Sequence, residues 1–139
     1  RFDPVFIACF TNRPISFMAK KEAFDYPIVG KIIKKCYAFP VDREKGDISA
    51  MKTAISILES GNVMSMFPEG TRSKNGELGE FKKGAAFISY RANVPIIPMK
   101  IEGTYKIFSK LILKIGEPIY PIKDKNEMTE LLRESIENF

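Results

Sequence analysis

The sequence contains no histidine and no tryptophan, and only two of its 139 residues are cysteines. Cys9 and Cys36 stand far apart with no Cys-x-x-Cys pair, so the pattern predicts neither a zinc site nor a disulfide framework, and we expect no metal. Without histidine, a Ser-His-Asp or Cys-His nucleophilic group cannot form within these residues. No apolar run approaches the roughly 18 residues that a membrane-spanning helix requires.

Two familiar site motifs are also missing. There is no Gly-x-x-x-x-Gly-Lys loop for a nucleotide and no Gly-x-Ser-x-Gly elbow for a serine hydrolase. The chain starts at Arg1 rather than at a methionine, within a segment that looks structured. We therefore expect a fragment whose preceding residues are missing, together with any membrane anchor that they carry.

The composition is that of an ordinary globular protein, 45% hydrophobic and 28% charged, and we expect one domain over residues 1–139. Lysine and arginine total 22 against 17 acidic residues, a net charge of +5. This excess suits an anionic partner, which leaves phosphate ligands, anionic lipid surfaces and nucleic acid open.

Predicted strands alternate with predicted helices along the chain. Asp47 is a typical N-cap for the clearest helix, whose apolar positions step by three and four, with Gly61 as its stop. The alternation predicts an α/β fold with a mostly parallel sheet flanked by helices. The expected helices are 5–10, 23–35, 48–58 (apolar face Ile48, Met51, Ile55 and Leu58), 82–92 and 126–137 (apolar side Met128, Leu132 and Ile136), and the expected strands are 15–19, 37–41, 63–67, 94–99 and 111–115.

The most informative stretch is Phe67-Pro68-Glu69-Gly70-Thr71-Arg72-Ser73. It follows the apolar run 63–67, which indicates a buried strand, and Pro68 cannot continue a strand's hydrogen-bonded ladder. Gly70 lets the backbone reverse or approach a ligand closely. Arg72 carries a permanent charge in a planar fork that suits phosphate.

A basic pair follows at the start of an expected helix. Lys82 and Lys83, within Phe81-Lys82-Lys83-Gly84-Ala85, lie where backbone N–H groups already favour an anion. One lysine of such a pair commonly faces solvent instead. The pattern indicates a second contribution to a phosphate site.

Four blocks in order resemble the glycerolipid acyltransferases, the lysophosphatidate acyltransferase family, and cover residues 3–98. The match is nearly complete at Phe67–Arg72, and Phe39-Pro40-Val41-Asp42-Arg43 is similar to the second block, with Pro40 as a mild departure. Val94-Pro95-Ile96-Ile97-Pro98 is similar to the fourth. Asp3 fits the Asp of the family's His-x4-Asp motif, which puts the histidine before Arg1. The resemblance also implies a glycerol-3-phosphate acyltransferase-like fold.

The resemblance implies a role for each matching residue. A histidine outside this chain would take the proton of the acceptor hydroxyl, and Asp3 would orient that histidine. Acceptor and phosphate binding would fall to Arg43, Glu69, Gly70, Thr71, Arg72 and Lys82. Asp3 as a simple helix cap and Arg43 as a solvent-exposed strand end remain alternatives.

The implied activity is transfer of an acyl group from acyl-CoA or acyl-acyl carrier protein to the 2-hydroxyl of 1-acylglycerol 3-phosphate (lysophosphatidate). The thioester is a co-substrate, and no cofactor is needed. We expect action at a membrane surface, on its cytoplasmic face. The alternatives are the same chemistry on glycerol 3-phosphate or another lysophospholipid, and a non-catalytic phospholipid-binding domain. Nucleic acid is disfavoured because the charges cluster at loop ends around an apolar core.

Overall fold

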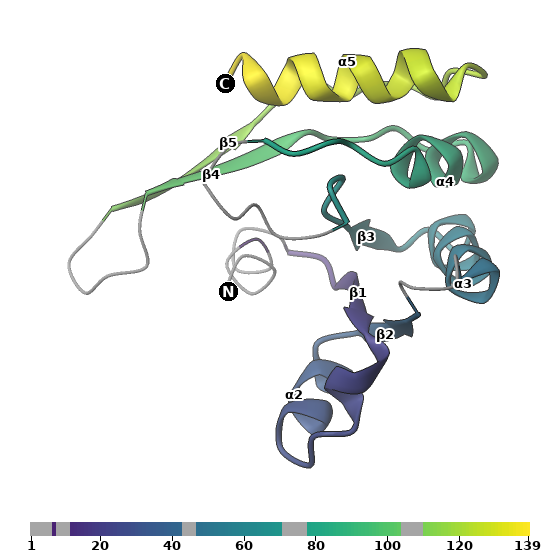
Figure 1. Cartoon of the computed structure of the whole chain (residues 1–139), viewed down its shortest axis with the longest axis vertical. Helices are drawn as coiled ribbons and strands as arrows, with labels where there is room; N and C mark the ends of the chain where they lie inside the picture. The colour runs from purple at the N-terminus through teal and green to yellow at the C-terminus, as the bar shows by residue number, and fades with distance from the viewer. Residues whose placement is uncertain (1–6, 8–11, 43–46, 71–77, 104–109) are drawn as a thin grey trace. The chain divides into compact units, whose positions relative to one another are not determined.

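The computed structural model describes residues 7, 12–42, 47–70, 78–103 and 110–139. Its contacts divide the chain into two compact units, Arg1–Phe67 and Pro68–Phe139. Figure 1 labels the α-helices and strands of both that are described below. No helix within the described ranges is long and apolar enough to cross a membrane.

The first unit is built on a parallel sheet of three strands. In chain order it contains β1 (Ile15–Lys20), the 3-10 helix η1 (Lys21–Phe24), α2 (Val29–Lys35), β2 (Ala38–Val41), α3 (Ile48–Glu59) and β3 (Val63–Ser65). The strand order is β2-β1-β3, and Phe17 of β1 lies opposite both Ala38 and Ser65. The predicted α/β class with a parallel sheet is confirmed here.

The core of this unit lies against the central strand. Ile15 and Phe17, two apart on β1, are both buried, as expected for side chains on one face of a strand. The predicted face of α3 is wrong at its start, because Ile48 is 71% exposed while Ala50 and Ala54 are buried. Small side chains let a helix approach its neighbours closely, and this packing overrides the apolar periodicity.

The expected helix 23–35 is two shorter elements. The chain forms η1 and then bends through Pro27 before α2 begins at Val29. Proline disfavours helical backbone in the residue before it, which accounts for the break. Gly30 packs so closely that a Cβ atom there would stand 2.4 Å from the carbonyl oxygen of Phe24.

The second unit pairs two helices and a hairpin. It contains α4 (Gly84–Ala92), β4 (Met99–Gly103), β5 (Leu111–Ile115) and α5 (Lys125–Glu137), with β4 and β5 antiparallel. The expected strand 94–99 is wrong, because the strand begins only at Met99 and Ile96 makes a single bridge to Ile119. Pro95 and Pro98 have no N–H to donate, which moves the ladder beyond them.

The helices supply the core of the second unit. Met128, Leu132 and Ile136 of α5 are buried, which confirms the predicted side of that helix. Ala85, Ala86 and Ser89 of α4 are buried as well, and their small side chains permit close packing. The packed helix places the N-terminus of α4 next to the Pro68–Gly70 turn, since the N–H of Lys82 donates to the carbonyl of Pro68 at 2.8 Å.

Candidate functional site

The Pro-Glu-Gly turn follows a strand that is shorter than expected. β3 ends at Ser65, its residues are half-buried rather than buried, and Phe67 is 47% exposed. Gly70 has φ +66, in the left-handed region that favours glycine. The sequence prediction of a backbone reversal at Gly70 is therefore confirmed.

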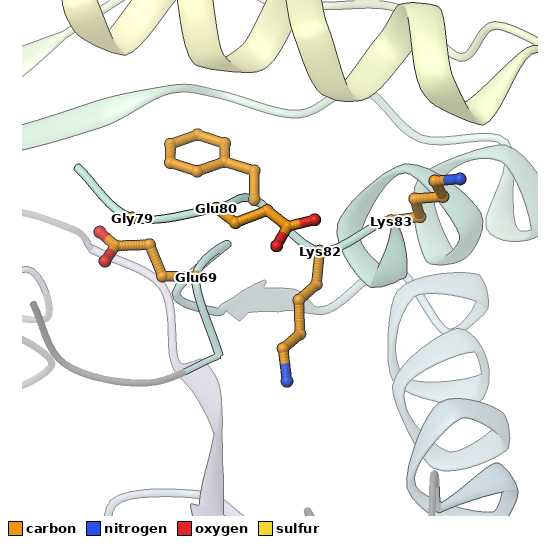
Figure 2. Close-up of a pocket in the computed structure, with 6 residues that line it drawn as sticks. Glu69, Gly79, Glu80, Lys82 and Lys83 are labelled. Atoms are coloured by element: carbon orange, nitrogen blue, oxygen red, sulfur yellow. The ribbon is translucent and has the colours of Figure 1, made fainter.

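An open pocket of 540 Å³ lies beside this turn in the second unit. It is lined by Glu69, Gly79, Glu80, Phe81, Lys82 and Lys83, and Figure 2 shows these side chains. Phe81 is buried and supplies an apolar wall, while Glu80 and both lysines are exposed. The pocket therefore combines carboxylates and ammonium groups around a solvent-accessible space.

The Glu69 carboxylate lies close to the backbone of Gly79. A Cβ atom built on residue 79 would stand 2.9 Å from Oε2 of Glu69, closer than real Cβ contacts allow. Figure 2 shows the Glu69 carboxylate directed toward Gly79. Any side chain at position 79 would move this carboxylate.

Gly70 is similarly close to the side chain of Lys82. A Cβ atom on residue 70 would lie 3.1 Å from Cδ, 3.2 Å from Cε and 3.4 Å from Nζ of Lys82. The methylene chain of the lysine thus runs across the glycine. This side-chain contact and the backbone hydrogen bond from the N–H of Lys82 to the carbonyl of Pro68 both join Lys82 to the Pro68–Gly70 turn.

The N-cap residue of helix α4 contributes no capping side chain. Its N-cap is Lys83, which makes no side-chain cap hydrogen bond, and the first turn carries no acidic residue. The free N–H groups and the helix dipole favour a negative charge at this end, whereas two lysines there are unfavourable to the helix itself. An anion bound at this end would accept hydrogen bonds from the N–H groups and offset the positive charge of the lysines.

Among the described residues, the charged groups that line the pocket do not pair with one another. Within the described part of the chain, no ion pair joins Glu69, Glu80, Lys82 or Lys83. Figure 2 shows the amines of Lys82 and Lys83 pointing in different directions, so one anion need not contact both. The arrangement can bind a phosphate and accept hydrogen bonds from hydroxyls.

In the first unit, the second motif block (residues 39–43) comes shortly before helix α3, whose N-cap is Asp47. Asp47 accepts hydrogen bonds from the N–H of Asp42 and the N–H of Ala50, both at 3.0 Å, which ties the end of β2 to the start of α3. Both hydrogen bonds lower the pKa of Asp47 below its usual 3.8, and the bond from the N–H of Asp42 has the larger effect. The cap that the sequence predicted is confirmed.

The predicted site residues divide into two groups. Glu69 and Lys82 line the pocket and Gly70 lies against Lys82, whereas Asp3, Arg43, Thr71 and Arg72 lie outside the described residues. Sequence reasoning missed Gly79 and Glu80. The only local signal for them was their position directly before the Phe-Lys-Lys run, and nothing near Gly79 in the sequence indicates that it faces Glu69.

Comparison with known proteins shows which family this chain is similar to. A family model described as Acyltransferase matches residues 1–102. A 1-acyl-sn-glycerol-3-phosphate acyltransferase of Bacillus subtilis (strain 168) is 37% identical over 135 residues, covering 88% of this chain and 67% of its own length. The enzyme of that name from Streptococcus pneumoniae (strain ATCC BAA-255 / R6) is 37% identical over 145 residues, covering 99% of this chain and 53% of its own length.

A solved structure has the same fold. The 1-acyl-sn-glycerophosphate (LPA) acyltransferase PlsC from Thermotoga maritima superimposes with a TM-score of 0.72 at 30% identity, covering 88% of this chain and 54% of its own. The chain thus spans between 53% and 67% of the length of these three relatives. With a family match over residues 1–102 and these relatives, the chain belongs to the acyltransferase family, among the glycerolipid acyltransferases that its motifs resemble.

Proposed function

We propose that these residues are the acceptor-binding part of a 1-acylglycerol-3-phosphate acyltransferase. The enzyme transfers an acyl group from a thioester to the 2-hydroxyl of lysophosphatidate and forms phosphatidate for phospholipid synthesis. The observation that carries the proposal is the N-terminus of α4, whose N-cap residue contributes no capping side chain, with Lys82 and Lys83 beside Glu69 in one pocket. A phosphate and a hydroxyl on one small glycerol backbone require cationic and carboxylate groups this close together.

The acceptor phosphate is bound first by charge. The N–H groups at the start of α4 and the lysine ammonium groups attract it, and Arg72 and Arg43 add the planar contacts that the family resemblance implies. Glu69, close to Gly79, positions the glycerol hydroxyl or holds the Pro68–Gly70 turn. Fixing the acceptor in this way lowers the entropic part of the barrier.

Chemistry at the hydroxyl needs a base that these 139 residues do not contain, since they include no histidine. In the proposed step the base takes the hydroxyl proton, the oxygen attacks the thioester carbonyl, and the C–S bond breaks. The thiolate leaves and takes the proton back from the base. Asp3, in its proposed role, orients that base and favours its protonated form.

The donor is acyl-CoA or acyl-acyl carrier protein, and we propose no metal and no bound cofactor. A thioester is already activated, so positioning and one base suffice. Because the acceptor is a lipid, we place the reaction at a membrane surface, on its cytoplasmic face, with the protein attached peripherally or through other segments.

An acceptor panel tests the proposal. The enzyme with its base present is supplied with acyl-CoA, and thiol release is followed with lysophosphatidate, glycerol 3-phosphate and other lysophospholipids. We expect the highest kcat/KM with lysophosphatidate. A preference for glycerol 3-phosphate or for an acceptor with an uncharged headgroup would show that lysophosphatidate is not the acceptor. Binding of lysophosphatidate without any thiol release would indicate a non-catalytic phospholipid-binding domain.

The 139-residue chain alone provides a second test. It contains no imidazole, so we expect it to bind the acceptor phosphate without turnover. Robust thiol release by this chain alone would refute the assignment of a histidine base oriented by Asp3.

A further inference from the structure

Exposed apolar side chains gather on one short segment of the first unit. Between residues 26 and 37, Tyr26 is 64% exposed, Ile28 74%, Ile32 56% and Tyr37 60%. Single exposed apolar residues are common on protein surfaces and need no explanation. Four lie between residues 26 and 37, on α2 and its two flanks, and we call this set of side chains the α2 patch.

The packing of α2 determines which side faces outward. Gly30 is buried against the carbonyl of Phe24, and Ile33 is half-buried. Ile28 and Ile32 are one helical turn apart, with the N–H of Ile32 donating to the carbonyl of Ile28 at 3.1 Å. They therefore form a continuous apolar stripe on the side opposite the packed glycine.

Lysines border this stripe. Lys31, Lys34 and Lys35 are exposed, and residues 26–37 contain no acidic residue. Among the described residues, none of the three lysines forms an ion pair. Lys31 follows Ile28, and Lys35 follows Ile32, at the i,i+3 spacing that makes helical residues neighbours, so these lysines are on the same side of the helix as the isoleucines.

Tyr37 occupies a backbone position that normally takes glycine. Its φ is +58, directly after the C-cap Cys36, where the left-handed conformation favours glycine over any other residue. The ring gains little from folding, because it is 60% exposed. Its exposure leaves the ring available to a surface partner.

We propose that the α2 patch is a docking surface for anionic membrane lipids. Apolar side chains flanked by lysines are the pattern of an interfacial helix, in which the apolar stripe enters the headgroup boundary and the ammonium groups contact lipid phosphates. Tyrosine is favoured at that boundary as well. The three lysines give this segment a positive charge, which selects a negatively charged surface over a neutral one.

This inference rests on the proposed function for its biological setting, since a lipid acceptor lies in a bilayer, but binding alone tests it. The purified protein is floated with vesicles of phosphatidylcholine and with vesicles containing about 30% phosphatidylglycerol, and bound protein is measured. We expect the anionic vesicles to bind more protein, and we expect high salt to weaken that binding.

Matched variants locate the surface. Ile28→Ser with Lys31→Gln should reduce binding to the anionic vesicles, by about fivefold for the lysine and about tenfold for the isoleucine. The control is Ile48→Ser with Lys52→Gln on α3, an exposed isoleucine and lysine one turn apart in the same unit. The control should bind like the unchanged protein.

Tyr37→Gly separates binding from folding. Glycine suits the left-handed backbone at this position, so the Tm should not fall, while binding to anionic vesicles should weaken. Equal loss in the α2 variant and the α3 control would overturn the proposal. Unchanged vesicle binding in both α2 variants would overturn it as well. If those changes instead abolish self-association, the α2 patch binds a protein partner and the lipid proposal is wrong.

Acyl transfer to a monomeric, detergent-dispersed acceptor, measured with the enzyme whose base is present, distinguishes the two proposals. If the α2 patch serves only membrane docking, its variants retain this activity and lose vesicle binding. If the proposed function fails, no variant shows thiol release, whatever the vesicle result.

Discussion

The Glu69 carboxylate lies against Gly79, where a Cβ atom would come within 2.9 Å of Oε2. The two residues belong to different segments of the pocket wall, so the absence of a side chain at position 79 determines where the carboxylate lies. Glu69 is in the block that most closely matches the acyltransferase family. We therefore propose that Gly79 is a positioning residue in the proposed acceptor site.

Gly79→Ala should lower kcat/KM for the acceptor about ten- to a hundredfold by displacing Glu69. The Tm should change little, because the group that moves is the end of a flexible side chain. The comparison is made in a double-mutant cycle with Glu69→Ala, whose background should abolish the effect of Gly79→Ala. Additive losses in the two variants would mean that Gly79 acts independently of Glu69.

Gly70→Ala and Gly70→Asn should differ in stability and agree in kinetics. Alanine at φ +66 costs about 1–2 kcal/mol, and asparagine tolerates this conformation better. Either side chain displaces Lys82, so both variants should lose acceptor affinity. Thermal melts and lysophosphatidate titrations check these expectations, and normal affinity in Gly70→Asn would show that the Lys82 position is unimportant.

Arg72→Ala should weaken use of phosphorylated acceptors far more than it changes the Tm. A charge-assisted phosphate contact is worth about 1.5–3 kcal/mol, which corresponds to roughly ten- to a hundredfold in kcat/KM. Arg72→Lys should restore only part of the loss, since a point charge replaces a two-pronged contact. Arg91→Ala, an exposed arginine on α4, is the matched control. An early melt with normal acceptor kinetics would make Arg72 a structural residue.

Asp47 should make the stability of the protein sensitive to acid. Folding lowers its pKa below 3.8, because the N–H groups of Asp42 and Ala50 donate to the carboxylate. A depressed folded pKa contributes stability above the unfolded value, and this contribution is lost as the pH falls through the folded pKa. The Tm difference between the unchanged protein and Asp47→Asn should therefore be constant near neutral pH and shrink below 3.8. A difference that is independent of pH would exclude a charged cap.

Local sequence chemistry was sufficient for several elements. The cap at Asp47 and the buried side of α5 at Met128, Leu132 and Ile136 were predicted correctly, because capping and helical periodicity depend only on residues a few positions apart. The ordered motif blocks likewise indicated the family, and Gly70 the turn, since these are properties of contiguous residues.

Tertiary structure decided what residues distant in the sequence do to one another. The burial of Ala50 and Ala54 in place of Ile48 depends on how closely α3 approaches its neighbours. The contact of Gly79 with Glu69 requires two chain segments to meet, and no local pattern encodes their distance. The exposure of Ile28 and Ile32 follows from the close packing of Gly30 on Phe24. Sequence determined the local chemistry, whereas packing between segments determined which side chains reach the pocket and which reach the surface.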